Sequence, residues 1–437
     1  MVPSLLYTLA WALALLDALG RVPLAGQAAG LAILAFLVWE LPRQRGSVRV
    51  LFLGMSVAGL LAVGFAAHPV ALFLAAWRRG AAYAAFFYAL GALRNAAESS
   101  PMVRASGRHL VAQPPGRRYA AMTIGGHLFG IILSYGAIEL FGTMLAGVAD
   151  PLRRRRMMMA VFRGFATMNC WSPLNIMTVV VSTAVPAARM GRLIPAAFLL
   201  ALVMLGIGWW LDRGHGAEPP APADRGGWLQ HLGVVALVGI VWGLAELVGR
   251  VFGVSLSVGV TAAVPVVGLA WLVAQRESLP ARLAGFARRI PSFRGEATVL
   301  GAGGFMGVAL GAVLPHGGIA AALGLLPPIA IPLAVPVLLV ATGLVGLNPI
   351  VVVAILGAAI PNPVALGVAP DTLAFACMLG WGVGVGMSAM SASALTTARW
   401  TETDPWTVTM RWNRVYTAWV LALALLAIAG AQLVLRP

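Results

Sequence analysis

Long apolar runs recur along the whole chain and are separated by short polar segments in which arginine is frequent. A helix that crosses the hydrocarbon core of a bilayer needs about 20 apolar residues, so one crossing and its loop take roughly 40 residues. The apolar windows lie near residues 4–20, 22–40, 49–67, 69–93, 119–148, 157–185, 190–211, 228–249, 251–275, 297–325, 329–361, 368–395 and 412–435. This pattern predicts an all-α polytopic membrane protein that crosses a lipid bilayer with about ten or eleven transmembrane helices.

Short motifs recur in the same order in the two halves of the chain, at an offset of about 180 residues, as they do in duplicated proteins. The matches are Glu98–Pro101 with Glu277–Pro280, Pro114–Gly130 with Pro291–Gly307, Leu133–Ile138 with Leu314–Ile319, and Ala166–Thr167 with Ala341–Thr342. They predict a first repeat over 48–211 and a second over 228–395, joined by a Pro- and Gly-rich linker at 212–227. N-terminal helices at 1–47 and a C-terminal loop and helix at 396–437 flank the repeats.

The first repeat contains a cluster of polar residues in the middle of an apolar window, near 157–185. The cluster consists of Thr167, Asn169, Ser172 and Asn175 around Pro173, which cannot donate a helical hydrogen bond. Non-helical backbone at membrane depth is tolerated only where it is buried or lines a wet cavity. We therefore expect a re-entrant hairpin whose tip holds a substrate or an ion. The alternative is a Pro-kinked helix whose Asn and Ser side chains join neighbouring helices.

The second repeat is interrupted at the corresponding place, in a hairpin near 329–361. Gly346 and Pro349 break the helical pattern next to Thr342 and Asn348. If both tips contribute to one site at the midplane of the membrane, the side chains of Asn175 and Asn348 are expected within about 15 Å of each other. The substrate-binding candidates of the two tips are therefore Thr167, Asn169, Ser172, Asn175, Thr342, Gly346 and Asn348.

A third candidate segment, Gly380–Ser393, alternates glycine with larger apolar residues and then becomes rich in serine. We expect this span to be unwound. The carbonyls of Gly382 and Gly384 would then bind a coupling cation, and the hydroxyls of Ser388 and Ser391 would bind an anion. The alternative is a tight helix crossing, because small residues let helices approach closely.

Ionisable residues inside the apolar windows are few and are candidates for function by default. Asp371 is the candidate for ion coupling, and Asp371 or Glu139 is the titrating carboxylate if the protein exchanges cations for protons. His127 and His316 have no assigned role. The sequence contains no motif of a metal site, a catalytic triad or a nucleotide-binding loop. We therefore expect no cofactor other than Na⁺ or H⁺ as a coupling ion.

Composition excludes a soluble enzyme, because 60% of the residues are hydrophobic and only 10% are charged, whereas a soluble domain has about 25% charged residues. The net charge of +16 is carried by arginines between the apolar runs, where such charges set topology. We therefore expect no nucleic-acid partner. Arginine is used throughout in place of lysine, which indicates a GC-rich bacterial genome and hence a bacterial inner membrane.

The paired helix breaks favour secondary active transport of a small solute, coupled to Na⁺ or H⁺. Half-helix N-termini offer unpaired amide hydrogens and the positive end of a helix dipole to an anion, so an organic or inorganic anion is the expected substrate. A cation/proton antiporter is the alternative within transport. A membrane-embedded enzyme acting on a lipid is the alternative of another class, and we expect no enzymatic activity.

The segment Gly301–Leu310, followed by Gly317–Ala320 and Gly346–Pro349, resembles the second half of gluconate-permease-like carriers and, more broadly, the ion transporter superfamily. That superfamily includes divalent-anion symporters, arsenite carriers and sodium/proton antiporters. The resemblance implies a homodimeric elevator carrier with a scaffold domain and a moving transport domain. It places hairpin tips at Ser172–Asn175 and Gly346–Pro349, and a second broken helix at Gly382–Ser393.

The same resemblance implies inverted repeats, which require an odd number of crossings between equivalent points of the two halves. The apolar windows between 119–137 and 297–315 give an even number when 157–185 is treated as a hairpin. The positive-inside rule also favours one side of the membrane for both Arg-rich loops, 94–118 and 276–294. Topology is therefore a question for the structure.

Overall fold

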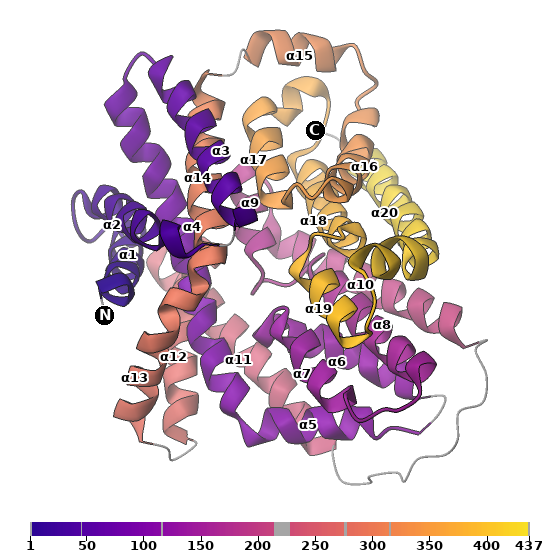
Figure 1. Ribbon diagram of the computed structural model, residues 1–437. Helices are drawn as coiled ribbons and strands as arrows, with labels where there is room; N and C mark the ends of the chain where they lie inside the picture. Colours follow the sequence, from indigo (N-terminus) through magenta and orange to yellow (C-terminus); the bar gives the residue numbers. More distant parts are fainter. Residues whose placement is uncertain are drawn as a thin grey trace. The chain divides into compact units, whose positions relative to one another are not determined.

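The computed structural model describes residues 2–44, 46–114, 117–213, 228–274, 278–313 and 316–435, and within these residues it contains helices and no strand (Figure 1). Seven helical segments of the described chain are long and apolar enough to cross a membrane: Ala25–Arg43, Met190–Asp212, Leu232–Phe252, Leu256–Ala274, Leu279–Val313, Pro370–Trp400 and Arg414–Val434. Shorter apolar helices accompany them. The expected all-α, multi-pass membrane protein is confirmed, and the expected number of crossings stays a prediction.

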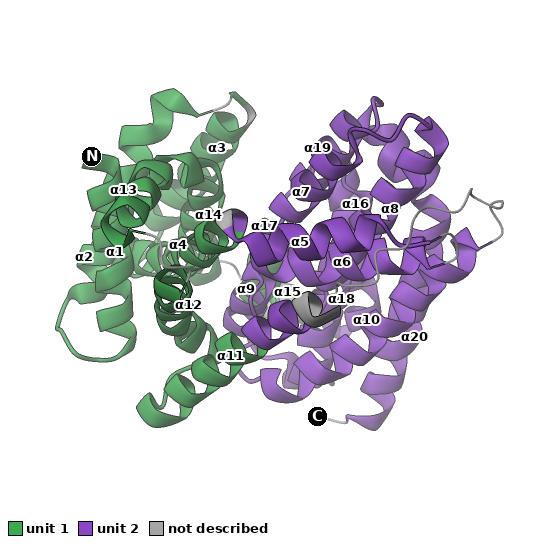
Figure 2. Cartoon of the chain, turned by 90° about the horizontal axis from the view of Figure 1, so that it is seen from below, with its two compact units in different colours: residues 1–97, 239–322, 353–361 green, residues 98–238, 323–352, 362–437 purple. Residues whose placement is uncertain are grey.

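The chain divides into two compact units, each built from separate stretches of sequence (Figure 2). Unit 1 comprises Met1–Ala97, Gly239–Ala322 and Val353–Pro361, whereas unit 2 comprises Glu98–Val238, Leu323–Val352 and Asn362–Pro437. Each unit therefore contains residues of both predicted repeats. Most of the predicted linker, 214–227, lies outside the described residues.

Unit 1 is formed mainly by α1 (Val2–Ala18), α2 (Ala25–Glu40), η1 (Leu41–Arg43), α3 (Gly46–Gly64), α4 (Pro69–Ser99), α12 (Leu256–Ala274), α13 (Leu279–Arg289), η2 (Ile290–Phe293), α14 (Arg294–Val313) and α15 (His316–Gly324). Its main helix pairs are α1 with α2 and α3 with α14. Helices α4 and α14 also touch closely, because a Cβ atom on Gly304 would lie 2.9 Å from the Cα atom of Gly80. Trp77 stacks on Phe305 beside this contact, with ring centroids 4.7 Å apart.

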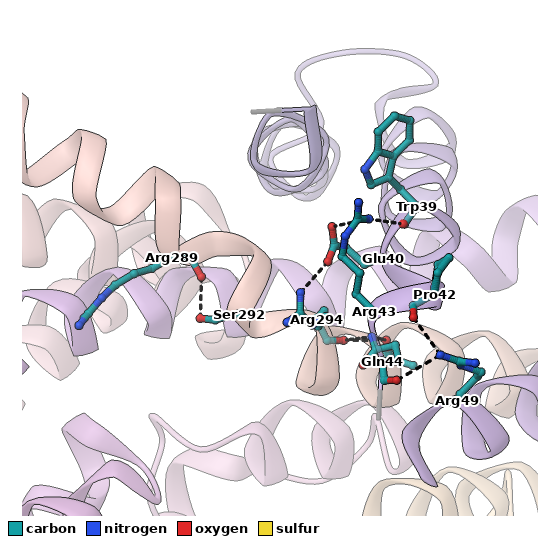
Figure 3. A network of polar contacts seen from close by, with 10 residues as sticks. Trp39, Glu40, Pro42, Arg43, Gln44, Arg49, Arg289, Ser292 and Arg294 are labelled. Carbon is teal, nitrogen blue, oxygen red and sulfur yellow. Dashed lines mark hydrogen bonds and ion pairs between the residues drawn. The ribbon is translucent and has the colours of Figure 1, made fainter. Parts of the chain in front are cut away.

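A polar network joins the end of α2 to the start of α14 within unit 1 (Figure 3). The Glu40 side chain is 2% exposed, and its carboxylate pairs with Arg294 at 2.8 Å and with Arg43 at 3.6 Å. Gln44 donates from Nε2 to the carbonyl of Arg294 at 2.9 Å and to Oγ1 of Thr298 at 2.6 Å. A buried carboxylate is costly unless it is paired, so these contacts hold the two helix ends together.

Unit 2 is formed mainly by α5 (Pro101–Val111), α6 (Arg118–Leu133), α7 (Gly136–Leu145), α8 (Pro151–Met168), α9 (Ile176–Ala184), α10 (Met190–Asp212), α16 (Ala330–Leu344), η3 (Pro363–Leu366), α18 (Pro370–Met387), α19 (Ala392–Trp400), η4 (Thr407–Trp412) and α20 (Arg414–Val434). Helices α11 (Trp228–Phe252) and α17 (Pro349–Ala359) contribute to both units. Pro101, Pro151 and Pro370 stand in the first turn of their helices, where the missing N–H group has no helical partner to lose. The main helix pairs are α6 with α8 and α16 with α18.

Candidate functional site

Three of the interruptions between consecutive helices of unit 2 fall where the sequence predicts a break. The first break, residues 169–175, separates α8 from α9. The second break, residues 345–348, separates α16 from α17, and the third break, residues 388–391, separates α18 from α19. All three lie inside the apolar windows, so these are interrupted helices rather than ordinary loops.

The polar side chains of the first break bind to one another and to nearby backbone. Asn175 caps α9, because its Oδ1 accepts from the amide of Met177 at 2.9 Å. Its Nδ2 donates to Oδ1 of Asn169 at 2.8 Å, and Asn169 donates in turn to the carbonyl of Phe165 at 2.7 Å. Ser172 is fully buried, and its carbonyl accepts from Oγ1 of Thr178. The segment is therefore a true break with an ordered polar interior.

The second break repeats the capping arrangement of the first. Oδ1 of Asn348 accepts from the amide of Ile350 at 2.9 Å, which is the contact that Asn175 makes at the start of α9. Gly346 has φ of +80°, a conformation that favours glycine. Thr342 donates from Oγ1 to the carbonyl of Leu338 at 2.7 Å, an ordinary bond within a helix.

The third break is shorter than the sequence predicts. Helix α18 remains helical through Gly382 and Gly384 and ends at Met387, and the carbonyl of Gly384 accepts from the amide of Ser388 at 3.0 Å. Oγ of Ser391 then caps α19. The expectation that the glycines themselves are unwound is wrong, because they serve close packing.

Gly382 and Gly384 pack so closely against neighbouring segments that a side chain at either position would collide with backbone atoms. A Cβ atom on Gly382 would lie 3.0 Å from the amide nitrogen of Cys170, in the first break. A Cβ atom on Gly384 would lie 2.9 Å from the carbonyl oxygen of Leu339 on α16. Helix α18 thus touches the first break on one side and α16 on another. Nothing in this arrangement supports cation binding by the carbonyls of Gly382 and Gly384.

All three breaks contact α18, the second and third at its end and the first one to two turns earlier, at Gly382 and Leu379. A Cβ atom on Gly343, just before the second break, would lie 3.2 Å from the carbonyl oxygen of Gly384 and 3.7 Å from Cβ of Ser388. A Cβ atom on Gly346 would lie 2.8 Å from Cγ of Met390. The second and third breaks are therefore in contact, and the first reaches α18 at Gly382, two residues before Gly384. The expected distance between Asn175 and Asn348 stays a prediction.

Three helices begin at these breaks, and each has a polar cap. Asn175, Asn348 and Ser391 accept from an amide in the first turn of α9, α17 and α19, respectively. The start of a helix carries about half a positive elementary charge and further amides without helical partners. The breaks therefore gather partial positive charge and small polar side chains, which are features of anion sites.

The predicted titrating carboxylates are engaged elsewhere. Asp371 is buried at the start of α18, where it accepts from the amide of Arg189 at 2.7 Å and pairs with its guanidinium at 3.5 Å. Glu139 pairs with Arg399 and accepts from Nε1 of Trp400 at 3.2 Å. Both carboxylates thus have structural partners, and no contact joins them to the breaks.

His127 is buried beside the first break, where it accepts a hydrogen bond from Trp171. Because the indole Nε1 only donates, Nε2 of His127 must be the acceptor in this bond of 2.9 Å. Nδ1 then carries the proton and faces the carbonyl of Gly164 at 3.1 Å. The side chain of His316 lies outside the described residues.

Two functional candidates were missed by the sequence reasoning, Arg163 and Asn413. Both lie inside apolar windows, which is the signal that marks them, and they meet at 3.0 Å between Nε of Arg163 and Oδ1 of Asn413. Beside them is a cavity of about the volume of one water molecule, lined among others by Thr167, Gly386 and Tyr416. Within the described chain, no three His, Cys, Asp or Glu side chains are grouped as a metal site requires.

Comparisons with known proteins identify a shared fold and no family. No protein-family model and no curated protein matches this chain. Among solved structures, the chain is similar to one described as the crystal structure of the YdaH transporter of Alcanivorax borkumensis, which has an unusual topology. The TM-score is 0.56 and the sequence identity 17%, over 79% of this chain and 84% of that one. This likeness shows the fold and does not single out the ion transporter superfamily.

Proposed function

We propose that the protein is a secondary active transporter that moves a small organic or inorganic anion across the bacterial inner membrane. The observation that carries the proposal is the set of three helix breaks along α18, with three capped helix starts, in unit 2. Broken helices that meet at mid-membrane form the substrate sites of many such transporters. The fold shared with a YdaH transporter supports the same class of function.

The transport cycle proposed is an elevator movement of unit 2, coupled to Na⁺ or H⁺, in a homodimer. The division into two compact units supports it, because the three breaks 169–175, 345–348 and 388–391 all lie in unit 2. Membership of the ion transporter superfamily belongs to the same proposal. Cation/proton antiport is less favoured, since Asp371 and Glu139 are both held in ion pairs with arginine.

The substrate class is tested first with an anion panel: acetate, benzoate, succinate, citrate, sulfate and phosphate, each radiolabelled. Uptake into proteoliposomes is measured under an inward Na⁺ gradient, an inward H⁺ gradient and neither. We expect gradient-dependent accumulation of at least one anion. Absence of uptake for the whole panel, with Na⁺/H⁺ exchange instead, would replace the proposal with antiport.

The site is tested with Asn175→Asp and Asn348→Asp. Aspartate caps a helix as well as asparagine does, so both caps are retained, while the new negative charge repels an anion at the break. We expect uptake to fall roughly tenfold or more in each variant. The thermal midpoint should change little in Asn348→Asp and fall in Asn175→Asp, because the latter also loses the donor to Oδ1 of Asn169. The matched control is Asp150→Asn, which makes the reverse exchange at the cap of α8 and should leave uptake unchanged. Normal uptake in both Asp variants would remove the breaks from the site.

A further inference from the structure

The third break frees a carbonyl that a continuous helix would have bonded. In an unbroken helix the carbonyl of Gly386 would accept from the amide of Met390, but α18 ends at Met387. Nδ2 of Asn413 donates to this carbonyl instead, at 2.9 Å. Asn413 is fully buried, between η4 and the start of α20. A side-chain amide thus stands where the backbone amide is missing.

The direction of the Asn413 amide is set by Arg163. Nε of Arg163 donates to Oδ1 of Asn413 at 3.0 Å, and a guanidinium can only donate. The oxygen of the amide must therefore face Arg163, which leaves its NH₂ group to donate to Gly386 and, at 3.2 Å, to Oγ1 of Thr417.

Arg163 is itself held rigidly on α8, the helix that leads into the first break. Its terminal nitrogens donate to the hydroxyl of Tyr119 at 2.9 Å and to the carbonyl of Trp412 at 3.0 Å. The guanidinium also lies over the ring of Tyr416, 5.0 Å from its centroid. One turn later, Thr167 shares a hydrogen bond of 2.8 Å with the Tyr416 hydroxyl. The helix that forms the first break therefore also supports the third.

We propose that Asn413 is a positioning residue that keeps the third break open, with Arg163 fixing its orientation, so that Ser388 and the start of α19, which Ser391 caps, are presented to the transported anion. The consequence for transport rests on the proposed function. The claim about the break stands on the geometry alone and is measured separately.

The first test is Asn413→Asp. The aspartate can still accept from Arg163, so α8 and α20 stay joined, but its second oxygen now faces the Gly386 carbonyl without a proton to donate. We expect amide hydrogen exchange over residues 388–395 to become about tenfold faster, with exchange in α6 unchanged. The matched control is Thr417→Val, which removes only the other acceptor of the same NH₂ group and should leave exchange within about twofold of the unmodified protein.

The second test is Gly386→Ala. Hydrogen exchange over residues 388–395 should become faster if Asn413 supports the break and slower if it does not. Alanine favours a helix over glycine by about a factor of five, so exchange over residues 388–395 should slow if Asn413 has no role. A Cβ atom on Gly386 would lie 3.3 Å from Nδ2 of Asn413 and would press against the amide that supports the break. We expect faster exchange, and this variant decides the question even if Asn413→Asp does not fold.

The third test measures uptake of the same anion panel. It distinguishes a positioning role of Asn413 from a role only in folding. If Asn413 positions the serines, Asn413→Asp raises the concentration for half-maximal uptake about tenfold. A purely structural role would lower the maximal rate at an unchanged half-saturation concentration. Unchanged or slower exchange in both Asn413→Asp and Gly386→Ala would overturn the inference. If no anion in the panel is transported, the proposed function fails while the exchange data still decide the role of Asn413.

Discussion

At the scale of single residues, some buried polar groups of unit 2 are satisfied by neutral partners alone. His127 is the clearest case, because its two ring nitrogens have different partners, Trp171 and the carbonyl of Gly164. The imidazole also stacks on the Trp171 ring, with centroids 5.7 Å apart. A buried acceptor left without its donor retains the full cost of its lost hydration. Trp171 thus satisfies the histidine and shapes the first break at the same time.

Trp171→Phe should therefore destabilise the protein although it keeps an aromatic ring. The variant removes the donor to Nε2 of His127, and we expect the free energy of unfolding to fall by about 1–3 kcal/mol. The measurement is chemical denaturation in detergent, followed by circular dichroism. Trp210→Phe is the matched control: Trp210 lies on α10 and is 46% exposed, so its replacement should change stability by less than about 0.5 kcal/mol. Equal effects of the two variants would contradict the role of the His127 contact.

At the scale of elements, α18 depends on small residues wherever another helix crosses it. Gly382 faces the first break, while Gly380 and Gly384 face α16. A Cβ atom on Gly380 would lie 2.7 Å from the Cα atom of Pro336. Close approach of this kind adds van der Waals contact where the membrane supplies no hydrophobic driving force between helices. The glycine alternation is thus a packing pattern.

Gly382→Ala should separate α18 from the first break. The added methyl group would meet the amide nitrogen of Cys170 and the carbonyl of Ala166, each at 3.0 Å, and overpacking of this kind costs about 1–3 kcal/mol. The control is Gly430→Ala on α20, where a Cβ atom meets nothing within 4 Å. That variant should be neutral or more stable by up to about 1 kcal/mol. The measurement is the thermal midpoint of each purified variant. A higher midpoint for Gly382→Ala than for Gly430→Ala would refute the packing role.

The sequence predicted the first two breaks where a helix-breaking residue stands beside polar residues. Pro173 and Gly346 each lie in a break, near an asparagine, whereas Pro336 stays inside α16 among apolar residues. The sequence predicted the third break from Gly382 onward, whereas α18 remains helical to Met387. Small residues occur both in unwound segments and at close helix contacts, and only the helices that pack against them distinguish the two. The contact between Arg163 and Asn413 could not be predicted, since the two residues are 250 positions apart and no local pattern shows which distant helices meet.

At the scale of the whole molecule, equivalent elements recur in the two predicted repeats. Helices α5 and α13 each have 11 residues, and each has a serine before its first residue and a proline in its first turn: Ser100 with Pro101, and Ser278 with Pro280. Asn175 and Asn348 make the same capping contact after the first and second breaks. These correspondences support the duplication, which stays a prediction, and they explain why one site could draw on both repeats.

The distance between the two tips is accessible to cross-linking. In a background with Cys170 and Cys377 replaced by alanine, Asn175→Cys and Asn348→Cys should be joined within one chain by a bismaleimide with a spacer of about 15 Å. Each single-cysteine variant is the control, because it can only form links between chains. A double variant that labels at both positions and forms no intramolecular link would place the two tips in different sites.

The directions of the helices around α18 favour an inverted repeat. Along α16, Pro336 lies beside Gly380 and Leu339 lies beside Gly384, so α16 and α18 run parallel. Along α8 the order is reversed, with Ala166 beside Gly386 and Cys170 beside Gly382.

Helices α8 and α16 therefore run in opposite directions, and the predicted duplication makes them equivalent helices of the two repeats. That orientation is the mark of an inverted repeat, whose site can face either side of the membrane.

Reporter fusions should therefore place the two Arg-rich loops on opposite sides of the membrane. An inverted repeat requires an odd number of crossings between α5 and α13, which favours opposite sides for fusions after residues 110 and 285. The positive-inside rule alone would place both loops in the cytoplasm. A fusion after residue 45 gives the side of the N-terminal helices and serves as the reference.

Alkaline phosphatase and a fluorescent protein report periplasmic and cytoplasmic locations, respectively. Equal signals at 110 and 285 would contradict the inverted repeat, whereas opposite signals would show that helix packing outweighs arginine distribution in setting the topology of this chain.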